Sequence, residues 1–153
     1  MTAALRSFPG LPHRTEHLGT IAGVEWYNDS KGTNPGATIA ALEGLASDAG
    51  RTVLIAGGQG KGADFSELAP AVKAHARALV LLGEDADRIA AALEGTVPMV
   101  KVADMTEAVE RAAELARPGD RVLLSPACAS FDMFRGFEHR GEVFRRCVEG
   151  LRP

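Results

Sequence analysis

Short apolar runs alternate with longer stretches of helical periodicity along most of this chain. The runs expected to form strands are residues 17–21, 24–27, 52–56, 78–82, 97–102 and 121–124. The first two flank Ala22 and Gly23, whose turn chemistry predicts an antiparallel hairpin. The later runs are separated by helical stretches, a pattern typical of parallel strands with crossover helices. We therefore predict an α/β, Rossmann-like fold, a mostly parallel sheet of about six strands that opens with the hairpin and carries helices on both faces.

The size and charge of the chain narrow the function classes. Its 153 residues are 46% hydrophobic, and at this length one domain buries about 70% of its unfolded surface. The formal net charge is −3, with both signs mixed along the chain, so there is no basic stripe for a nucleic acid. No apolar run approaches the ~20 residues of a membrane helix. We expect neither a nucleic-acid partner nor a membrane span.

The cysteines and the first residues of the chain indicate the cellular compartment of the protein. Cys128 and Cys147 are the two cysteines, and without a Cys-x-x-Cys pair they predict neither a disulfide framework nor a metal site. Arg6 and Pro9 interrupt any apolar core of a signal peptide. We expect a cytoplasmic protein, with residues 1–12 a short connector and residues 13–153 a single domain.

Helix starts are marked by capping residues. Asn34 stands before Pro35 and is expected to be an N-cap. Asp64 and Asp104 each precede a glutamate by three residues, as in a capping box. Residues 137–151 have an apolar stripe of helical period and predict an amphipathic C-terminal helix.

Three polar segments, residues 28–34, 57–64 and 125–132, each follow a predicted strand directly. Loops at the carboxyl ends of parallel strands converge on one edge of an open sheet. We therefore expect these segments to build one cleft, and place the function there.

The glycine-rich segment allows more than one interpretation. Gly58, Gly60 and Ala63 satisfy the Gly-x-Gly-x-x-Ala pattern of a dinucleotide site, with Glu84 and Asp85 near the position of a ribose-binding carboxylate. Any three-glycine turn can satisfy this short pattern, so a flexible turn is an equal explanation. A Walker A phosphate loop is excluded, because Ile55 and Gly62 stand where glycine and Ser or Thr are required. A dinucleotide-binding, oxidoreductase-type domain remains the alternative.

Lys61 lies among these glycines, ahead of a predicted helix. A long cation beside bare backbone amides would hold an anion, so we favour an anion site here. A non-enzymatic anion-binding module would use the same residues.

The other two segments also carry binding groups. Asp29, Lys31 and Thr33 crowd the end of a strand and suit an anion and an amine, whereas Asn34 is explained by capping alone. Ser125, Cys128 and Ser130 could be nucleophiles, but there is no Gly-x-Ser-x-Gly elbow and His139 has no clear carboxylate partner. We interpret Ser130 as a hydrogen-bond donor to an anion rather than as part of a hydrolase.

Four blocks in this order closely resemble the C-terminal domain of the Mur ligases: residues 11–16, 28–34, 57–65 and 124–132, with residues 134–141 continuing the match. Within that family, the blocks at 61–65 and 125–137 are similar to the members that add D-glutamate rather than alanine or a diamino acid. Small departures are Gly32, where alanine is usual, and Gln59, where aspartate is common.

The resemblance implies an ATP-dependent amide ligase of peptidoglycan precursor synthesis. Such a ligase phosphorylates the terminal carboxylate of UDP-N-acetylmuramoyl-L-alanine, and the amine of D-glutamate then attacks the acyl phosphate. It also implies that ATP and Mg²⁺ are bound mainly by a central domain that this chain does not contain, and that residues 1–12 are a remnant of the linker that follows that domain. We accordingly expect the isolated domain to be an inactive monomer.

Site residues follow from the resemblance, position by position. The implied D-glutamate ligands are Thr33, Lys61, Ser130, Phe131 and Phe137. The implied nucleotide-binding residues are Arg14 and Asp29, and the implied catalytic residues are Lys31 and His13.

Overall fold

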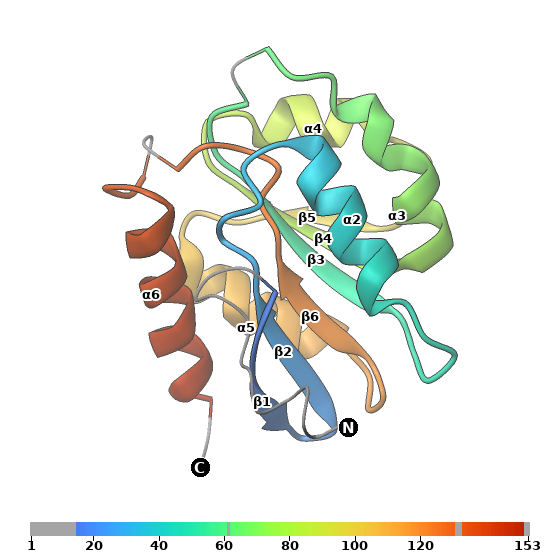
Figure 1. Cartoon of the computed structure of the whole chain (residues 1–153), viewed down its shortest axis with the longest axis vertical. Coiled ribbons are helices and arrows are strands. Elements are labelled where there is room, and N and C mark those ends of the chain that lie inside the picture. The colour runs from blue at the N-terminus through green and yellow to red at the C-terminus, as the bar shows by residue number, and fades with distance from the viewer. Residues whose placement is uncertain (1–14, 61, 131–132, 152–153) are drawn as a thin grey trace.

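The computed structural model describes residues 15–60, 62–130 and 133–151. In this part of the chain the strands form one six-stranded sheet of order β1-β2-β6-β3-β4-β5 (Figure 1). The strands are β1 Glu16–Ile21, β2 Val24–Asn28, β3 Thr52–Gly57, β4 Ala76–Leu82, β5 Met99–Lys101 and β6 Arg121–Leu124. β1 pairs with β2 antiparallel and every other pair is parallel. The predicted α/β fold with its opening hairpin is confirmed.

The helical elements are α2 Pro35–Leu45, the 3₁₀ turn η1 Phe65–Leu68, α3 Ala69–His75, α4 Ala86–Ala92, α5 Met105–Leu115 and α6 Phe137–Glu149. Two of the predicted caps are present: the side chains of Asn34 and Asp104 accept hydrogen bonds of 2.9 Å from the amides of Ala37 and Glu107. Asp64 caps a 3₁₀ turn instead of an α-helix. The three capping residues were therefore predicted correctly, whereas the type of the shortest helical element was not.

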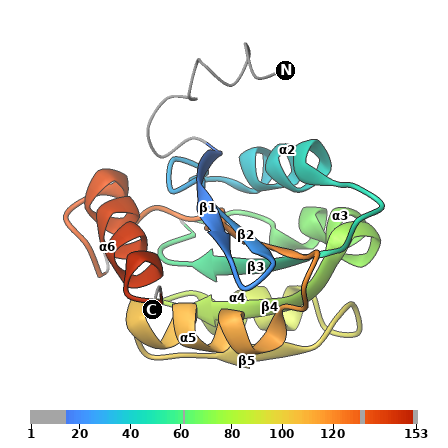
Figure 2. The same cartoon turned by 90° about the horizontal axis from the view of Figure 1, so that it is seen from below.

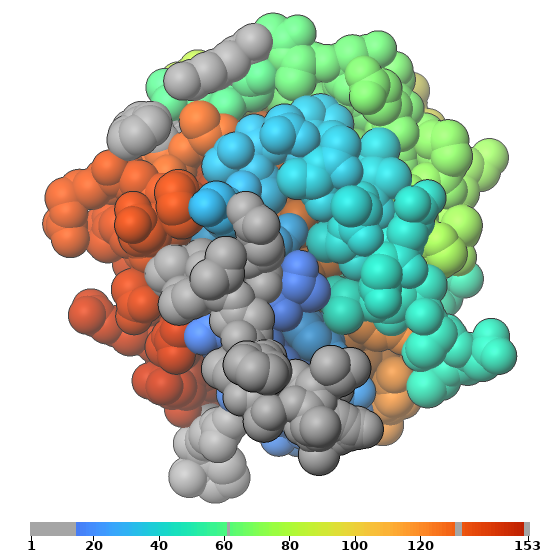
Figure 3. Space-filling view, in the orientation of Figure 1, coloured from blue at the N-terminus to red at the C-terminus, as the bar shows by residue number. Residues whose placement is uncertain are grey.

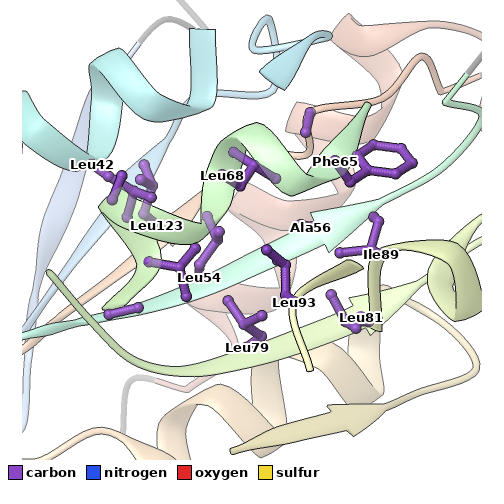
Figure 4. Packing of buried hydrophobic residues seen from close by; sticks show 14 of the residues in the cluster. Leu42, Leu54, Ala56, Phe65, Leu68, Leu79, Leu81, Ile89, Leu93 and Leu123 are labelled. Carbon is purple, nitrogen blue, oxygen red and sulfur yellow. The ribbon is translucent and has the colours of Figure 1, made fainter. Parts of the chain in front are cut away.

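Side chains of the central strands alternate between two layers of core. Leu54 and Leu79 face a cluster that includes residues of α2, η1, α3 and α4, and Figure 4 shows this packing. Val53 and Val80 face the opposite cluster, which includes residues of α5 and α6. Figure 2 shows α2 and α3 on one side of the sheet and α5 on the other. Strands buried on both faces read as continuous apolar runs, which is why residues 52–56 and 78–82 were recognisable.

The amino ends of the strands are held by a buried carboxylate. Asp120 is 1% exposed and accepts hydrogen bonds from the guanidinium of Arg77 and from the amides of Arg51 and Arg117. Burial alone would raise the pKa of Asp120, but these hydrogen bonds together outweigh it and lower the pKa. The same pairing raises the pKa of Arg77. This charge cluster lies at the end of the sheet opposite the three polar segments.

Candidate functional site

The three polar segments begin at the carboxyl ends of the neighbouring strands β2, β6 and β3. Backbone hydrogen bonds join them: the Asp29 amide donates to the Leu124 carbonyl at 2.7 Å, and the Gly57 amide donates to the Pro126 carbonyl at 3.0 Å. In Figure 3 the light-blue surface around α2 lies beside the orange and red surface around α6. The predicted meeting of these segments at one edge is confirmed.

Further contacts fasten the loop after β6 to both neighbours. Gln59 and Ala129 exchange two backbone hydrogen bonds of 2.9 Å, and the Ala127 amide donates to the Gly32 carbonyl at 2.8 Å. Ala127 has a φ of +64° and is 1% exposed. A non-glycine residue in this conformation is strained and persists where its surroundings impose it. The loop is thus held in one shape by its neighbours.

Asp29 is 5% exposed and its carboxylate ties two segments together. Its Oδ1 accepts from the Thr15 amide at 3.0 Å, and its Oδ2 accepts from the Ser125 hydroxyl at 2.7 Å. A Cβ at Gly32 would lie 2.6 Å from the Ser125 Oγ, so glycine allows this close approach. Asp29 therefore has a structural role in addition to the role expected for it.

An open pocket of about 570 Å³ lies next to the hydrogen bonds of Asp29. Its lining includes Asp29, Lys31, Thr33 and Phe137. The Lys31 Nζ lies 5.6 Å from the centroid of the Phe137 ring, a distance at which a cation is attracted to an aromatic face. The pocket thus offers a cation, a hydroxyl and an aromatic wall to a small ligand with charged groups.

The remaining predicted site residues are not all in this pocket. Ser130 is 2% exposed and follows Ala129, the residue bridged to the glycine-rich segment; it is not part of the pocket lining. His13, Arg14, Lys61 and Phe131 lie outside the described residues. The structure brings together four of the predicted residues and places a fifth on the adjoining loop.

The glycine-rich segment does not present the bare amides that the sequence analysis expected. The amides of Gly57 and Gln59 donate to the loop after β6, and the Gly60 amide donates to Asp85 Oδ2 at 2.6 Å. Asp64 accepts from the Ser66 amide at 3.0 Å. The expectation of bare amides is therefore wrong at Gly57, Gln59 and Gly60, and the role expected of Lys61 stays a prediction.

Packing explains why these positions are glycine. A Cβ on Gly57, whose φ is +136°, would lie 1.7 Å from the Leu82 carbonyl oxygen, and a Cβ on Gly60 would lie 2.4 Å from the Phe65 ring. The Asp85 carboxylate, expected at a ribose in the dinucleotide hypothesis, is already bonded to Gly60 and to Arg88. The glycine pattern thus reflects a tight turn, and the dinucleotide alternative has no support.

The structure does not support the hydrolase interpretation either. The Ser125 hydroxyl donates to Asp29, and His139 Nδ1 accepts from the Arg135 amide at 3.0 Å. Among the described residues no serine hydroxyl is hydrogen-bonded to a histidine. Cys128, fully buried at 0% exposed, packs in the core.

Sequence analysis assigned no role to Ser30 and Arg140. Hydrogen bonds of these two residues link the loop after β2 to the loop after β6. Arg140 is 2% exposed, and its guanidinium donates to Ser30 Oγ at 2.9 Å, to the Ser30 carbonyl at 2.7 Å and to the Cys128 carbonyl at 3.0 Å. The available signal was its spacing: Arg140 lies four residues before the buried Phe144, on the face of α6 that packs inward.

The described part of the chain contains neither a metal-ligand cluster nor a helix that could span a membrane. Residues 15–60, 62–130 and 133–151 contain no group of three or more His, Cys, Asp or Glu side chains that could hold a metal ion. Across the same ranges, no helix has the length and hydropathy required to cross a bilayer.

Known proteins resemble this chain in sequence and in fold. The family described as "Mur ligase, glutamate ligase domain" matches residues 13–128. The UDP-N-acetylmuramoylalanine–D-glutamate ligase of Bordetella parapertussis is 62% identical over 152 residues, which are 99% of this chain and 29% of that protein. The chain spans about a third of the length of the curated relatives it matches.

Solved structures show the same fold at low sequence identity. A murein peptide ligase from Psychrobacter arcticus matches 97% of this chain and 32% of its own, with a TM-score of 0.66 and 17% identity. A bifunctional folylpolyglutamate synthase/dihydrofolate synthase from Yersinia pestis, complexed with AMPPNP and Mn ion, matches 91% of this chain and 32% of its own, with a TM-score of 0.65 and 16% identity.

Proposed function

The chain belongs to the family of Mur ligase glutamate ligase domains, and from this premise we propose that it is the amino-acid-binding C-terminal domain of a D-glutamate ligase of peptidoglycan precursor synthesis. The observation that carries the proposal is the 62% identity to a UDP-N-acetylmuramoylalanine–D-glutamate ligase across 99% of the chain. The full-length protein would join D-glutamate to UDP-N-acetylmuramoyl-L-alanine at the expense of ATP. This chain would supply the loops that bind the amino acid.

The pocket chemistry agrees with an amino-acid diacid as ligand. D-glutamate carries two carboxylates and an amine, so it needs cations and hydroxyl donors at separated points and an open path for the amine. Lys31 and Thr33 line the pocket. Lys61 and Ser130 are proposed to complete the binding site, with Phe131 and Phe137 beside the ligand. Holding the amine in line with an activated acyl carbon can supply several kcal/mol of the barrier reduction.

ATP, when bound, would supply the phosphoryl group that activates the acceptor carboxylate. In this proposal Arg14 and Asp29 contact the nucleotide, and His13 and Lys31 lie close to the reacting groups. An ionised carboxylate has about four lone-pair sites, so Asp29 can accept from a nucleotide hydroxyl while it is bonded to Thr15 and Ser125. Mg²⁺, like ATP, would be bound mainly by the central domain of the full-length ligase. We further propose a cytoplasmic monomer.

The test is a phosphate-release assay on the full-length protein with ATP, Mg²⁺ and UDP-N-acetylmuramoyl-L-alanine. We expect release to depend on D-glutamate, with little response to L-glutamate or D-alanine. The isolated 153-residue chain should show no release. A full-length protein that binds NAD tightly and shows no dependence on D-glutamate would overturn the proposal.

A further inference from the structure

One buried arginine joins the two loops that border the proposed amino-acid site. Arg140 lies in the first turn and a half of α6, and its partners Ser30 and Cys128 are 110 and 12 residues away in sequence. Ser30 immediately precedes Lys31, and Cys128 lies two residues before Ser130. The guanidinium therefore connects the segment that carries Lys31 and Thr33 to the segment that carries Ser130.

Ser30 extends this connection to the aromatic wall of the pocket. Its hydroxyl accepts from Arg140 Nε and donates to the Phe137 carbonyl at 2.6 Å. The Phe137 ring in turn lies against the Lys31 ammonium group. A shift of Arg140 would thus be transmitted to Lys31, Phe137 and the segment before Ser130 together.

The geometry requires a guanidinium. Its planar fork carries five N–H donors and can bond to two loops at once, whereas a lysine ammonium is a compact group on a single stem. We propose that Arg140 is a positioning residue that sets the spacing of the two halves of the amino-acid site. This inference rests on the proposed function, because it concerns the affinity of that site for D-glutamate.

The chain offers a matched control at the opposite end of the sheet. Arg121 is 5% exposed and, like Arg140, its guanidinium donates to a serine hydroxyl and a backbone carbonyl, those of Ser47 and Gly50. These contacts lie at the amino ends of the strands. A conservative change at Arg121 therefore removes a similar buried network far from the pocket.

The experiment compares Arg140→Lys, Ser30→Ala and Arg121→Lys in the full-length protein, with steady-state kinetics for D-glutamate and for the uridine-nucleotide substrate. Loss of one or two charge-assisted hydrogen bonds that position the D-glutamate-binding groups should raise KM for D-glutamate about tenfold in Arg140→Lys. Because Ser30 directly precedes Lys31, a proposed catalytic residue, kcat should fall as well, whereas KM for the uridine-nucleotide substrate should stay unchanged. Ser30→Ala should raise KM for D-glutamate by a smaller factor, and Arg121→Lys should leave it unchanged.

The outcomes separate the inference from the proposed function. If the wild-type protein does not use D-glutamate, both fall. If it does, and both pocket-side variants keep the wild-type KM for D-glutamate, or Arg121→Lys raises it as much as Arg140→Lys, the positioning role is overturned. Ser30→Ala removes one hydroxyl and decides the question if Arg140→Lys fails to fold.

Discussion

The hydroxyl of Ser125 donates a hydrogen bond of 2.7 Å to the carboxylate of Asp29, 96 residues earlier in the chain. Both residues are buried, and each stands at the start of the loop that leaves its strand. The contact therefore fixes how the β2 and β6 loops meet, and with them the pocket that contains Lys31 and Thr33. The site is built on a polar network as much as on the apolar core.

Changing Ser125 to alanine tests this network. The substitution removes a buried donor from Asp29, and leaving a buried charged group short of a partner costs about 1–3 kcal/mol. We expect the free energy of unfolding, measured by urea denaturation of the 153-residue chain, to fall by that amount. Ser66→Ala is the control, because Ser66 is exposed although it also bonds to an aspartate, Asp64. Equal effects of the two changes would contradict the role given to Ser125.

Two glycines of the same loop should respond differently to alanine. Gly57 and Gly62 both have positive φ values, but a Cβ at Gly57 would overlap the Leu82 carbonyl, whereas a Cβ at Gly62 would meet nothing within 4 Å. Gly62→Ala should cost only the conformational penalty of about 1–2 kcal/mol. Gly57→Ala should cost clearly more, with a correspondingly lower thermal midpoint. If Gly62→Ala is the more damaging change, packing is not the reason for glycine at position 57.

The Asp120 cluster predicts a dependence of stability on pH. The pKa of Asp120 is lowered on folding, from an ordinary value of 3.8. Its contribution is therefore fully present above the ordinary pKa and is lost as pH falls through the lower, folded pKa. We expect Asp120→Asn to reduce the free energy of unfolding by about 3 kcal/mol near neutral pH, because Arg77 loses its buried partner.

The same variant should also flatten the acid limb of the stability curve, measured by urea denaturation between neutral pH and pH 3. Asp64→Asn is a useful comparison, since the Asp64 pKa is also lowered but the group is exposed and bonds to its near neighbour Ser66. An acid limb in Asp120→Asn as steep as in the wild type would rule out Asp120 as a source of the dependence.

Much of the fold could be predicted because it depends on residues that lie close together in the sequence. The two faces of β3 bury alternate side chains, so Leu54 and Ile55 extend one continuous apolar run. The N-cap at Asn34 could be predicted from its neighbour Pro35 alone. The edge strand β5 is shorter than its apolar pattern, which included Pro98, because proline has no N–H for a sheet ladder.

What could not be predicted depends on partners distant in sequence. Arg140 is one of several charges on an amphipathic helix, and only its distant acceptors, Ser30 and Cys128, distinguish it from the others. Nothing in the sequence near Gly60 indicates that its amide donates to Asp85, 25 residues further on. Side-chain networks of this kind are set by tertiary structure and leave little trace in spacing or propensity.

We propose that loops from three neighbouring strands bind one small diacid together. A crystal structure of the full-length protein with its ligation product bound would test this arrangement. We expect the D-glutamyl carboxylates to lie within hydrogen-bond distance of Thr33, Lys61 and Ser130, with the Phe137 ring alongside. A D-glutamyl group bound at another edge, or these three residues too far apart to contact it together, would contradict the proposal.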